Sequence, residues 1–354
     1  MRRIDRYWKR CAAGMMAALT LMLGQGTMQS FAMNAQVVTS PNKIIVQDET
    51  QNTDDQNNNG TQNVVSKAEV AGFGEVSTPV TDSSSYFGKG RLTLLANHDT
   101  AAQQLAVIIE TGEGGLIVVD GGWTDNTDYV LNQIKAKGGH VQAWLITHPD
   151  SDHAGALADI LYKHAGEITI DGIYYSFLED SWYAEKDANV ASMVAYIKGA
   201  FAKVSPSILH GDIVAGQVIN AGPAKIQVLN QAYKENNDFV NNSSVAYMVS
   251  LNGVFLGDLG NTGGEHLMQD VNLAALKCKM VQMSHHGQNG VGYEVYKALR
   301  PSVCLWPTPQ WLWDNDNGGG AGSGSWKTQE TRNWMTRLGV KEYYVTKDGD
   351  QVIE

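Results

Sequence analysis

Four side chains with metal-binding chemistry lie within six residues of this 354-residue chain. His148, Asp150, Asp152 and His153 follow directly after the apolar run 141–146. If that run is a buried strand that enters a tight loop, the first three side chains point to one side, because alternate residues of an extended chain do so. The fourth then begins the next element at the same corner. Imidazole and carboxylate together suit zinc, manganese or iron, so we predict a metal site here.

A plainer interpretation makes the same loop a helix cap. Ser151 or Asp152 would then be the N-cap of the apolar run that follows Ala154. This interpretation accounts for one serine or one aspartate, but not for two histidines and two aspartates at this spacing. A metal site is therefore the preferred hypothesis.

The motif resembles the HxDxDH variant of the metallo-β-lactamase superfamily, found in the nuclease-like domain of ComEC-type competence proteins. Further segments are similar and stand in the same order: 115–122, which contains Asp120, 254–258, which ends in Asp258, and 281–287, which contains His285 and His286. Segments 299–306 and 344–353 are similar to the ending of ComEC-type domains. The resemblance covers residues 90–354. It implies an α/β protein with the four-layer αββα metallo-β-lactamase fold.

The resemblance also implies that the chain holds two divalent ions, either zinc or manganese. The expected ligands are His148 and Asp150 on one ion, Asp152, His153 and His286 on the other, and Asp258 as a bridge between the two. A water that bridges two such ions loses a proton near neutral pH and becomes the nucleophile. The residues expected at the catalytic step are Asp152, Asp258 and His285.

The neighbouring histidines 285 and 286 leave a choice of ligand. Other members of the superfamily place the ligand directly before a small residue, and Gly287 follows His286 here. We therefore expect His286 to bind metal and His285 to contact a ligand or the substrate. Asp120 is expected to brace the loops of the site and not to bind metal.

Two departures from the superfamily pattern bear on the metal. Asp150 stands where most members have histidine, so its site is richer in oxygen and admits manganese. The middle histidine of the family is missing, and its place reads Asn-Asn-Ser-Ser at 241–244, which makes Asn242 a candidate for substrate binding. The intervening histidines, His164 and His210, are expected near a helix end and in a turn, away from the metal.

The first residues of the chain predict export. Five Lys or Arg residues among the first ten precede an apolar run from Cys11 to Leu23, and Ser30-Phe31-Ala32 follows as a small-x-small site. This pattern indicates a secretory signal peptide, residues 1–32, with Ala35 as the rival cleavage site. A membrane anchor is disfavoured because a span needs ~20 apolar residues. We expect a secreted protein, free or attached to the cell wall, without a transmembrane segment after cleavage.

Residues 33–89 are predicted to be a linker, followed by one hydrolase domain at 90–354. Residues 47–62 are almost wholly Asn, Gln, Asp and Thr and have no apolar side chain to bury. A cell-wall spacer and unselected disorder both remain open. The domain is long enough for one large core. Periodicity predicts strands at 105–109, 116–119 and 141–146, and helices at 128–137 and 294–299.

The charge of the chain bears on its substrate. Without residues 1–32 it carries 21 Lys and Arg against 36 Asp and Glu, a net charge of −15. Proteins that grip long DNA usually present a basic surface. We therefore expect a small or cell-wall-associated phosphodiester as substrate, and duplex nucleic acid is possible but disfavoured.

Aromatic residues are candidates to line the substrate pocket. They gather at 174–183 and at 306–313, and a glycine-rich loop, expected to be mobile, links the second stretch to Trp326. Trp313 and Trp326 are predicted to stack on a base, a sugar or a quaternary ammonium group. The alternative, that these tryptophans only pack the insertion onto the body, remains open.

The predicted function is that of a secreted, binuclear metal-dependent hydrolase of phosphodiester bonds. One alternative is hydrolysis of another ester or amide, such as a lactone or a β-lactam, on the same fold. A third possibility is a cell-wall binding module with a relict metal site. Cys278 and Cys304 are expected to be buried thiols, although a disulfide is permitted outside the cell.

Overall fold

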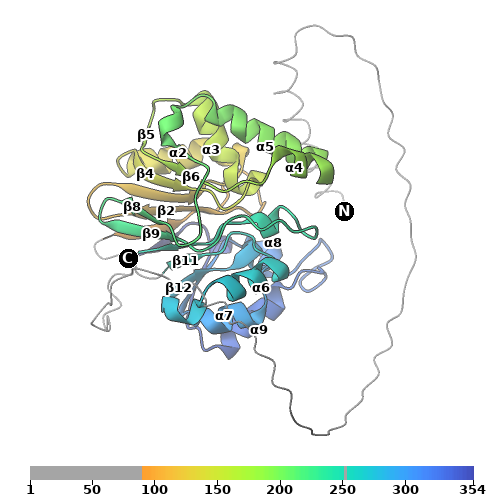
Figure 1. Ribbon diagram of the computed structural model, residues 1–354. Coiled ribbons are helices and arrows are strands. Elements are labelled where there is room, and N and C mark those ends of the chain that lie inside the picture. The colour runs from red at the N-terminus through yellow and green to blue at the C-terminus, as the bar shows by residue number, and fades with distance from the viewer. Residues whose placement is uncertain (1–89, 251–252) are drawn as a thin grey trace, which may run out of the picture. The chain divides into compact units, whose positions relative to one another are not determined.

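Two β-sheets that pack face to face form the centre of the computed structural model, which describes residues 90–250 and 253–354 (Figure 1). The predicted signal peptide and linker lie outside the described residues. All described residues fall within one compact unit. Among them, no helix is long and apolar enough to cross a membrane.

The first sheet has the strand order β15-β1-β2-β3-β4-β6-β7, with β5 paired to β4. Its strands are β1 (Arg91–Leu94), β2 (Ala106–Glu110), β3 (Leu116–Asp120), β4 (His140–Leu145), β5 (Thr169–Ile170), β6 (Ile173–Tyr174), β7 (Leu209–His210) and β15 (Gln351–Ile353). Strands β3, β4, β6 and β7 are parallel, so their C-terminal ends lie at one edge.

The second sheet has the order β14-β13-β12-β11-β10-β9-β8. Its strands are β8 (Val218–Ala221), β9 (Ala224–Val228), β10 (Tyr247–Val249), β11 (Gly253–Phe255), β12 (Met280–Gln282), β13 (Val303–Trp306) and β14 (Glu342–Val345). Strands β11 to β14 are parallel, and they too end at one common edge.

Helices cover the outer face of each sheet (Figure 1). On the first sheet lie α2 (Thr127–Ala136), α3 (Ser151–Lys163) and α5 (Ala188–Phe201), with α4 (Asp180–Lys186) beside α5. On the second lie α6 (Asn261–Asp270), α7 (Tyr293–Leu299) and α9 (Thr328–Arg337), with α8 (Gln310–Trp313) beside α9. Short 3-10 turns are η1 (Thr124–Asn126), η2 (Pro206–Ile208), η3 (Asn241–Ser243), η4 (Leu273–Leu276), η5 (Ser284–Gly287) and η6 (Thr346–Asp348).

Apolar side chains explain why the layers stack in this order. In β3, Val119 points into the layer between the sheets, whereas Val118 packs under the helices of the first sheet. In β13, Leu305 and Cys304 divide in the same way between the inner layer and the helices of the second sheet. Strands covered on both faces must be apolar on both, and each large side chain buried contributes about 1.5–3 kcal/mol. The predicted four-layer αββα fold is confirmed.

The two cysteines of the described chain are buried free thiols, as expected, and they form no disulfide. Burial raises the pKa of Cys278 to about 12 and also raises the pKa of Cys304. Both thiols pack among the apolar side chains outside the second sheet. Their role is therefore that of small apolar residues in the core.

Candidate metal centre

The site residues predicted from the sequence follow the C-terminal ends of strands in both sheets. Asp120 ends β3, and the loop 146–150 leads from β4 into α3. Asp258 follows β11, and the segment 284–287 follows β12. Loops at the C-terminal ends of parallel strands meet at one edge of a sheet, which is where such folds place ligands. Packing of the two sheets then brings both sets of loops together.

The tightest group consists of Asp152, His153, Asp258 and His286, all of them buried. One ligand atom from each lies within 4.8 Å of the others. Asp258 Oδ2 is 3.2 Å from His153 Nε2 and 3.2 Å from His286 Nε2. His286 Nε2 is also 3.2 Å from Asp152 Oδ2. The carboxylate of Asp258 thus lies between the two imidazoles.

His148 and Asp150 form a neighbouring pair. His148 Nε2 is 3.5 Å from Asp150 Oδ2, and the ring centroids of His148 and His153 are 4.2 Å apart. His148 is fully buried, whereas the Asp150 side chain is 33% exposed. Asp150 is the N-cap residue of α3, yet its side chain makes no capping hydrogen bond. The N-cap of α3 is neither Ser151 nor Asp152, so the interpretation of this loop as a helix cap at those residues is wrong. The carboxylate of Asp150 does not cap the helix either.

Asp120 supports the site through contacts with Thr147 and His153. Its Oδ1 accepts the backbone N–H of Thr147 (2.8 Å), and its Oδ2 accepts the Thr147 hydroxyl (2.7 Å). The same Oδ2 is 2.8 Å from His153 Nδ1. A carboxylate on one ring nitrogen fixes the orientation of an imidazole and leaves the other nitrogen for a ligand. These contacts confirm the expected role of Asp120 as a brace.

Glycine is required where the loop of Asp258 passes Thr147. Gly257 has a φ of +56°, and a Cβ on it would lie 2.7 Å from Thr147 Cβ and 2.9 Å from Ser244 Oγ. Ser244 Oγ accepts the backbone N–H of Asp258 (3.0 Å). The loop can approach Thr147 this closely only because residue 257 has no side chain.

Asn242 is engaged in the same support. Its Oδ1 accepts N–H groups of Gly260 (3.1 Å) and Gly263 (2.9 Å), where α6 begins. Its Nδ2 donates to the carbonyl oxygen of Asn237 (2.8 Å). The amide group is therefore bonded within the protein at both ends. Binding of substrate by Asn242 stays a prediction, and the contacts observed favour a structural role.

Buried atoms of the centre lack hydrogen-bond partners among the described residues. They are Nε2 of His148, His153 and His286, and Oδ1 of Asp258. An unpaired buried polar group costs ~1–3 kcal/mol, so native structures rarely keep several side by side. Imidazole nitrogen and carboxylate oxygen are ligands of zinc, manganese and iron. The donor set therefore fits divalent metal ions.

Opposite charges shift the pKa values within this group. Burial acts to lower the pKa of His286, but the carboxylates of Asp258 and Asp152 outweigh it and raise the pKa to about 9. The pKa of His153 is raised well above its usual value against the effect of burial, first by Asp258 and then by Asp120. Burial acts to raise the pKa of Asp258, but the histidines hold it well below its usual range. The raised pKa values of His153 and His286 favour the protonated imidazoles, and a bound ion would displace those protons.

The segment that carries His285 and His286 has a strained backbone. The two residues have φ values of 51° and 53°, a left-handed conformation that costs about 1–2 kcal/mol per residue outside glycine. Two contacts hold it in place. The N–H of His285 donates to the carbonyl of Gly257 (3.1 Å), and the Thr308 hydroxyl donates to the carbonyl of His286 (2.6 Å).

This backbone sends the two rings to different places. His286 is fully buried, and its Nδ1 lies 3.2 Å from the carbonyl of Pro307, so its Nε2 faces the carboxylates. His285 Nε2 is 3.9 Å from Asp258 Oδ2, and its side chain is 18% exposed. The arrangement favours His286 as the ligand and leaves His285 at the rim of the centre.

The other intervening histidines lie outside the centre. His164 is the C-cap residue of α3 and contacts Glu167 (2.8 Å), so its expected place near a helix end is confirmed. His210 stacks on Tyr174, with 4.5 Å between the ring centroids, and lies in β7. The prediction of a turn at His210 was wrong because the short strand pairs with β6 there.

Tryptophans of the insertion contact the protein itself. Trp313 packs edge-on against Trp306, with 5.2 Å between centroids, and the Arg332 guanidinium lies 4.0 Å from its ring. Trp326 packs edge-on against Trp311, with 4.9 Å between centroids. These contacts agree with the packing interpretation, and substrate binding by Trp313 and Trp326 stays a prediction.

Gln103 near the centre escaped the sequence analysis, whereas Tyr183 entered it only as the last member of the aromatic stretch 174–183. Gln103 Nε2 donates to Asp152 Oδ2 (3.4 Å), and Trp123 Nε1 donates to the Gln103 carbonyl (2.6 Å). Tyr183 is fully buried, and burial raises its pKa, with a further contribution from the nearby Asp150 carboxylate. No local pattern marks Gln103, because its contact with Asp152 forms only when the loop between β1 and β2 folds over the start of α3.

Residues 99–216 match the family described as the metallo-beta-lactamase superfamily. The match covers about a third of the chain, and the two sheets and outer helices of the described residues agree with the fold of that superfamily. The match does not distinguish the ComEC-type variant from other members. No curated protein sequence matches the chain.

Several solved structures are similar at low sequence identity. The metallo-beta-lactamase fold protein YhfI from Bacillus subtilis is 13% identical, with a TM-score of 0.46 over 75% of this chain and 99% of that one. A diphosphatase from the PhnP family is 11% identical, with a TM-score of 0.41 over 74% and 97%. CmlA, a diiron beta-hydroxylase from Streptomyces venezuelae, is 12% identical, with a TM-score of 0.47 over 75% and 54%.

Proposed function

We propose that this chain is a secreted hydrolase of phosphodiester bonds that depends on two divalent metal ions. The observation that carries the proposal is the position of Asp258 Oδ2, 3.2 Å from the Nε2 atoms of both His153 and His286. The pair His148–Asp150 lies directly beside this group. One carboxylate is thus placed to serve two neighbouring sets of ligands.

The residues divide between two ion positions. Asp152, His153 and His286 would hold one ion, His148 and Asp150 the other, with Asp258 shared by both. When bound, such ions activate water near neutral pH and stabilise negative charge in the transition state. Most members of the metallo-β-lactamase superfamily are metal-dependent hydrolases, which supports hydrolysis as the class of reaction.

The charge of the site supports an anionic ester as substrate. Two dications against the three carboxylates of Asp150, Asp152 and Asp258 leave one positive charge, if the imidazoles are neutral when they bind metal. A phosphodiester carries one negative charge and therefore matches the site. Low dielectric strengthens this attraction, because five of the six proposed ligand side chains are buried.

His285 is the residue placed to act on the substrate side. Its Nε2 is 3.9 Å from Asp258 Oδ2, and its partly exposed ring lies at the rim of the centre. At this place the ring can donate a hydrogen bond to a phosphoryl oxygen or a proton to the leaving group. Asp152 and Asp258 would contribute to this step as ligands that fix the positions of the ions.

Export is part of the proposal and rests on residues 1–32, which have the pattern of a signal peptide. Residues 33–89 would then separate the enzyme from whatever anchors or surrounds it. Cleavage after Ala32 is tested by N-terminal sequencing of the protein recovered from the culture medium. A full-length chain retained in the cell would contradict this part of the proposal.

The reaction is tested on the metal-loaded protein with three substrates: bis-p-nitrophenyl phosphate, nitrocefin and a lactone. Hydrolysis of each is followed by the change in absorbance of the substrate or of a coupled indicator. We expect turnover of the phosphodiester, its loss after chelation, and its return with manganese or zinc. Turnover of nitrocefin or the lactone alone would overturn the phosphodiester and establish the alternative on the same fold. Bound metal without turnover of any of the three would leave only a binding module.

A further inference from the structure

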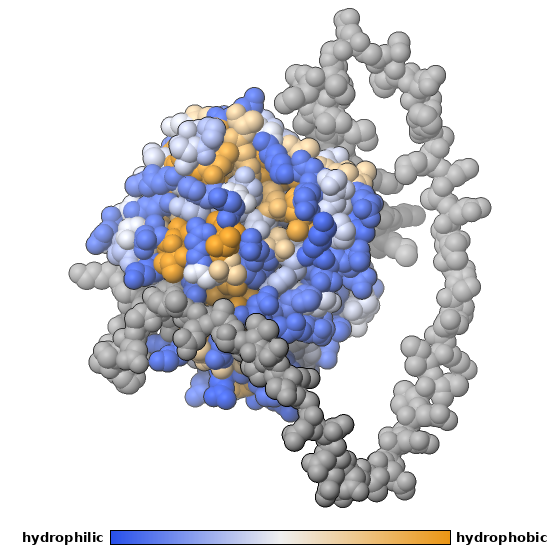
Figure 2. All heavy atoms as spheres, in the orientation of Figure 1, coloured by the Kyte–Doolittle hydropathy of each residue, from blue (hydrophilic) through white to orange (hydrophobic). Residues whose placement is uncertain are grey.

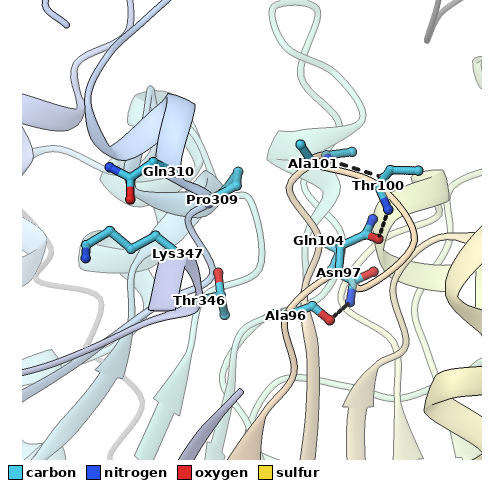
Figure 3. A pocket seen from close by; sticks show the side chains of 10 residues that line it. Ala96, Asn97, Thr100, Ala101, Gln104, Pro309, Gln310, Thr346 and Lys347 are labelled. Atoms are coloured by element: carbon cyan, nitrogen blue, oxygen red, sulfur yellow. Dashed lines mark hydrogen bonds between the residues drawn. The ribbon is translucent and has the colours of Figure 1, made fainter. Parts of the chain in front are cut away.

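A cavity of about 170 Å³ lies between two walls that come from distant parts of the chain (Figure 3). One wall is the loop that leads from β1 to β2, with Asn97, Thr100 and Gln104. The other follows β13 and β14, with Gln310, Thr346 and Lys347. Figure 3 shows the two sets of side chains on opposite sides of the gap.

Each wall is attached to a residue of the metal centre. Gln103, next to Gln104 in the first wall, donates through Nε2 to Asp152 Oδ2 (3.4 Å). In the second wall, Thr308 precedes Pro309 and donates its hydroxyl to the carbonyl of His286 (2.6 Å). Both walls of the cavity are therefore joined to residues of the centre through the residue next to them in the chain.

A tryptophan ties the two walls together. Trp311 Nε1 donates to the carbonyl of Ala101, which lines the first wall, at 2.6 Å. Trp311 follows Gln310 of the second wall, and Trp326 packs against its ring. This hydrogen bond sets the separation of the walls, so the cavity is preformed.

The lining is polar, and its one charge is paired with a carboxylate beside the cavity. Lys347 is its one cation, and its ammonium is bonded to both carboxylate oxygens of Asp348 (2.6 and 2.8 Å). Neither an aromatic ring nor a carboxylate belongs to the lining. A charged ligand would thus lose its water without gaining an opposite charge, and a base would find no ring to stack on.

Donors and acceptors alternate on the walls. Asn97 Nδ2 is buried without a hydrogen-bond partner among the described residues. Thr100 Oγ1 accepts the N–H of Ala102 (3.3 Å), which leaves its proton to donate. Gln310 donates to Asp314 (2.6 Å), which leaves its amide oxygen to accept. No hydrogen bond within the described chain engages the Thr346 hydroxyl. A ligand hydroxyl both donates and accepts, and it matches such a lining.

We propose that this cavity binds an uncharged, hydroxyl-bearing group on one side of the scissile phosphodiester, a sugar ring or a polyol. The inference rests on the proposed function, because the phosphodiester is what places this group. The cavity is smaller than the ~300–1,000 Å³ typical of larger organic ligands, and it accommodates a single ring or a short polyol.

The test compares p-nitrophenyl phosphodiesters of methanol, glycerol and glucose on the manganese-loaded protein. All three share the leaving group, so differences report on the other ester group. Two added hydrogen bonds of about 1 kcal/mol each correspond to about tenfold or more in KM. We expect the glycerol and glucose esters to have a KM at least about tenfold below that of the methyl ester, with similar kcat.

Variants locate the effect. Thr346→Val removes a hydroxyl, and Asn97→Asp removes the Nδ2 donor but keeps the oxygen that accepts from Thr100. Each should reduce the advantage of the glycerol ester several-fold and leave turnover of the methyl ester and the metal content unchanged. Thr93→Val on β1 is the matched control: its buried hydroxyl has no partner among the described residues and lies outside the lining.

The outcomes separate the cavity from the proposed function. Equal KM values for the three esters, unaffected by either variant, would overturn the cavity as a binding site while the phosphodiesterase stood. If no ester were cleaved, the proposed function would fail, and saturation-transfer NMR with glycerol and methyl glucoside would decide on the cavity. Saturation transfer that is seen in the parent protein and lost in the double variant Asn97→Asp/Thr346→Val would support the cavity as a binding site. No saturation transfer in the parent protein would overturn it.

Discussion

At the scale of single residues, the centre depends on carboxylates that are held in place by backbone N–H groups and by imidazoles. Asp258 is the most constrained of them. Its N–H donates to Ser244 Oγ, and its Oδ2 faces His153 and His286, which follow strands of different sheets. Asp120 performs the complementary task, because it fixes His153 from the side away from Asp258.

We predict that Asp258→Ala loses both metal ions together with activity, because one carboxylate serves both positions. Metal content by inductively coupled plasma mass spectrometry should fall from two ions per chain to fewer than one. Asp212→Ala, a change of an exposed carboxylate outside the centre, should retain both. An inactive Asp258→Ala protein that still holds two ions would rule out a bridging role.

The buried thiols give a prediction about pH. Burial raises the pKa of Cys278 to about 12, so at pH 8 only about one thiol in 10⁴ is ionised. Because its pKa is raised, the Cys278 thiol keeps its proton in the folded protein. The reactivity of the thiol increases only as the pH approaches this pKa. Native protein lacking residues 1–32 should thus react negligibly with Ellman's reagent at pH 8, whereas urea-unfolded protein should release two equivalents. Comparable rates in both states would contradict this.

Much of the group of side chains at the candidate centre could be predicted from the sequence, because most of them stand close together in the chain. His148, Asp150, Asp152 and His153 stand within six residues after an apolar strand, so burial of that strand is enough to bring them to one place. Residues that join the site through tertiary contacts could not be predicted. Gln103 reaches Asp152 across 49 positions of sequence, and Trp311 reaches Ala101 across 210.

At the scale of elements, strand ends and tight loops decide where the ligands lie. The predicted strands 105–109, 116–119 and 141–146 agree within a residue with β2, β3 and β4, since their apolar runs are buried on both faces. The predicted helices 128–137 and 294–299 agree equally well with α2 and α7. The short strands β5, β6 and β7 have two residues each, too few to show any periodicity.

The loop before Asp258 should be sensitive to a single methyl group. We predict that Gly257→Ala destabilises the protein by about 1–3 kcal/mol and weakens metal binding by at least about tenfold, because a Cβ would push against Thr147 and displace Asp258. Gly339→Ala is the control: its φ is +79°, but a Cβ there meets nothing within 4 Å. It should lower stability in thermal unfolding and leave metal affinity unchanged. Equal metal affinities in the two variants would contradict the expectation that a Cβ at residue 257 displaces Asp258.

At the scale of the whole molecule, charge bears on the proposed substrate. The chain after residue 32 carries a net charge of −15. Figure 2 shows one face, where hydrophilic side chains predominate and apolar ones form smaller patches. Association with a long polyanion gains from a basic surface, and an acidic surface instead repels it. A small ester that reaches the centre avoids most of this repulsion.

We therefore predict that the enzyme cleaves small phosphodiesters faster than plasmid DNA at physiological salt. Initial rates per phosphodiester bond, measured with the same metal-loaded preparation, provide the comparison. Raising the salt concentration should relieve the repulsion and narrow the difference, since salt screens charges over about 8–10 Å under these conditions. Plasmid cleavage at the rate of the best small substrate would indicate an extracellular nuclease.

The proposed centre requires that two ions share Asp258. Titration of the metal-free protein with manganese, followed by electron paramagnetic resonance, tests it directly, because the site is rich enough in oxygen to accept this metal. We predict two manganese ions per chain, a spin-coupled signal from a closely spaced pair, and turnover of bis-p-nitrophenyl phosphate at least equal to that with zinc. A single bound ion with the isolated six-line signal of mononuclear manganese would contradict the account.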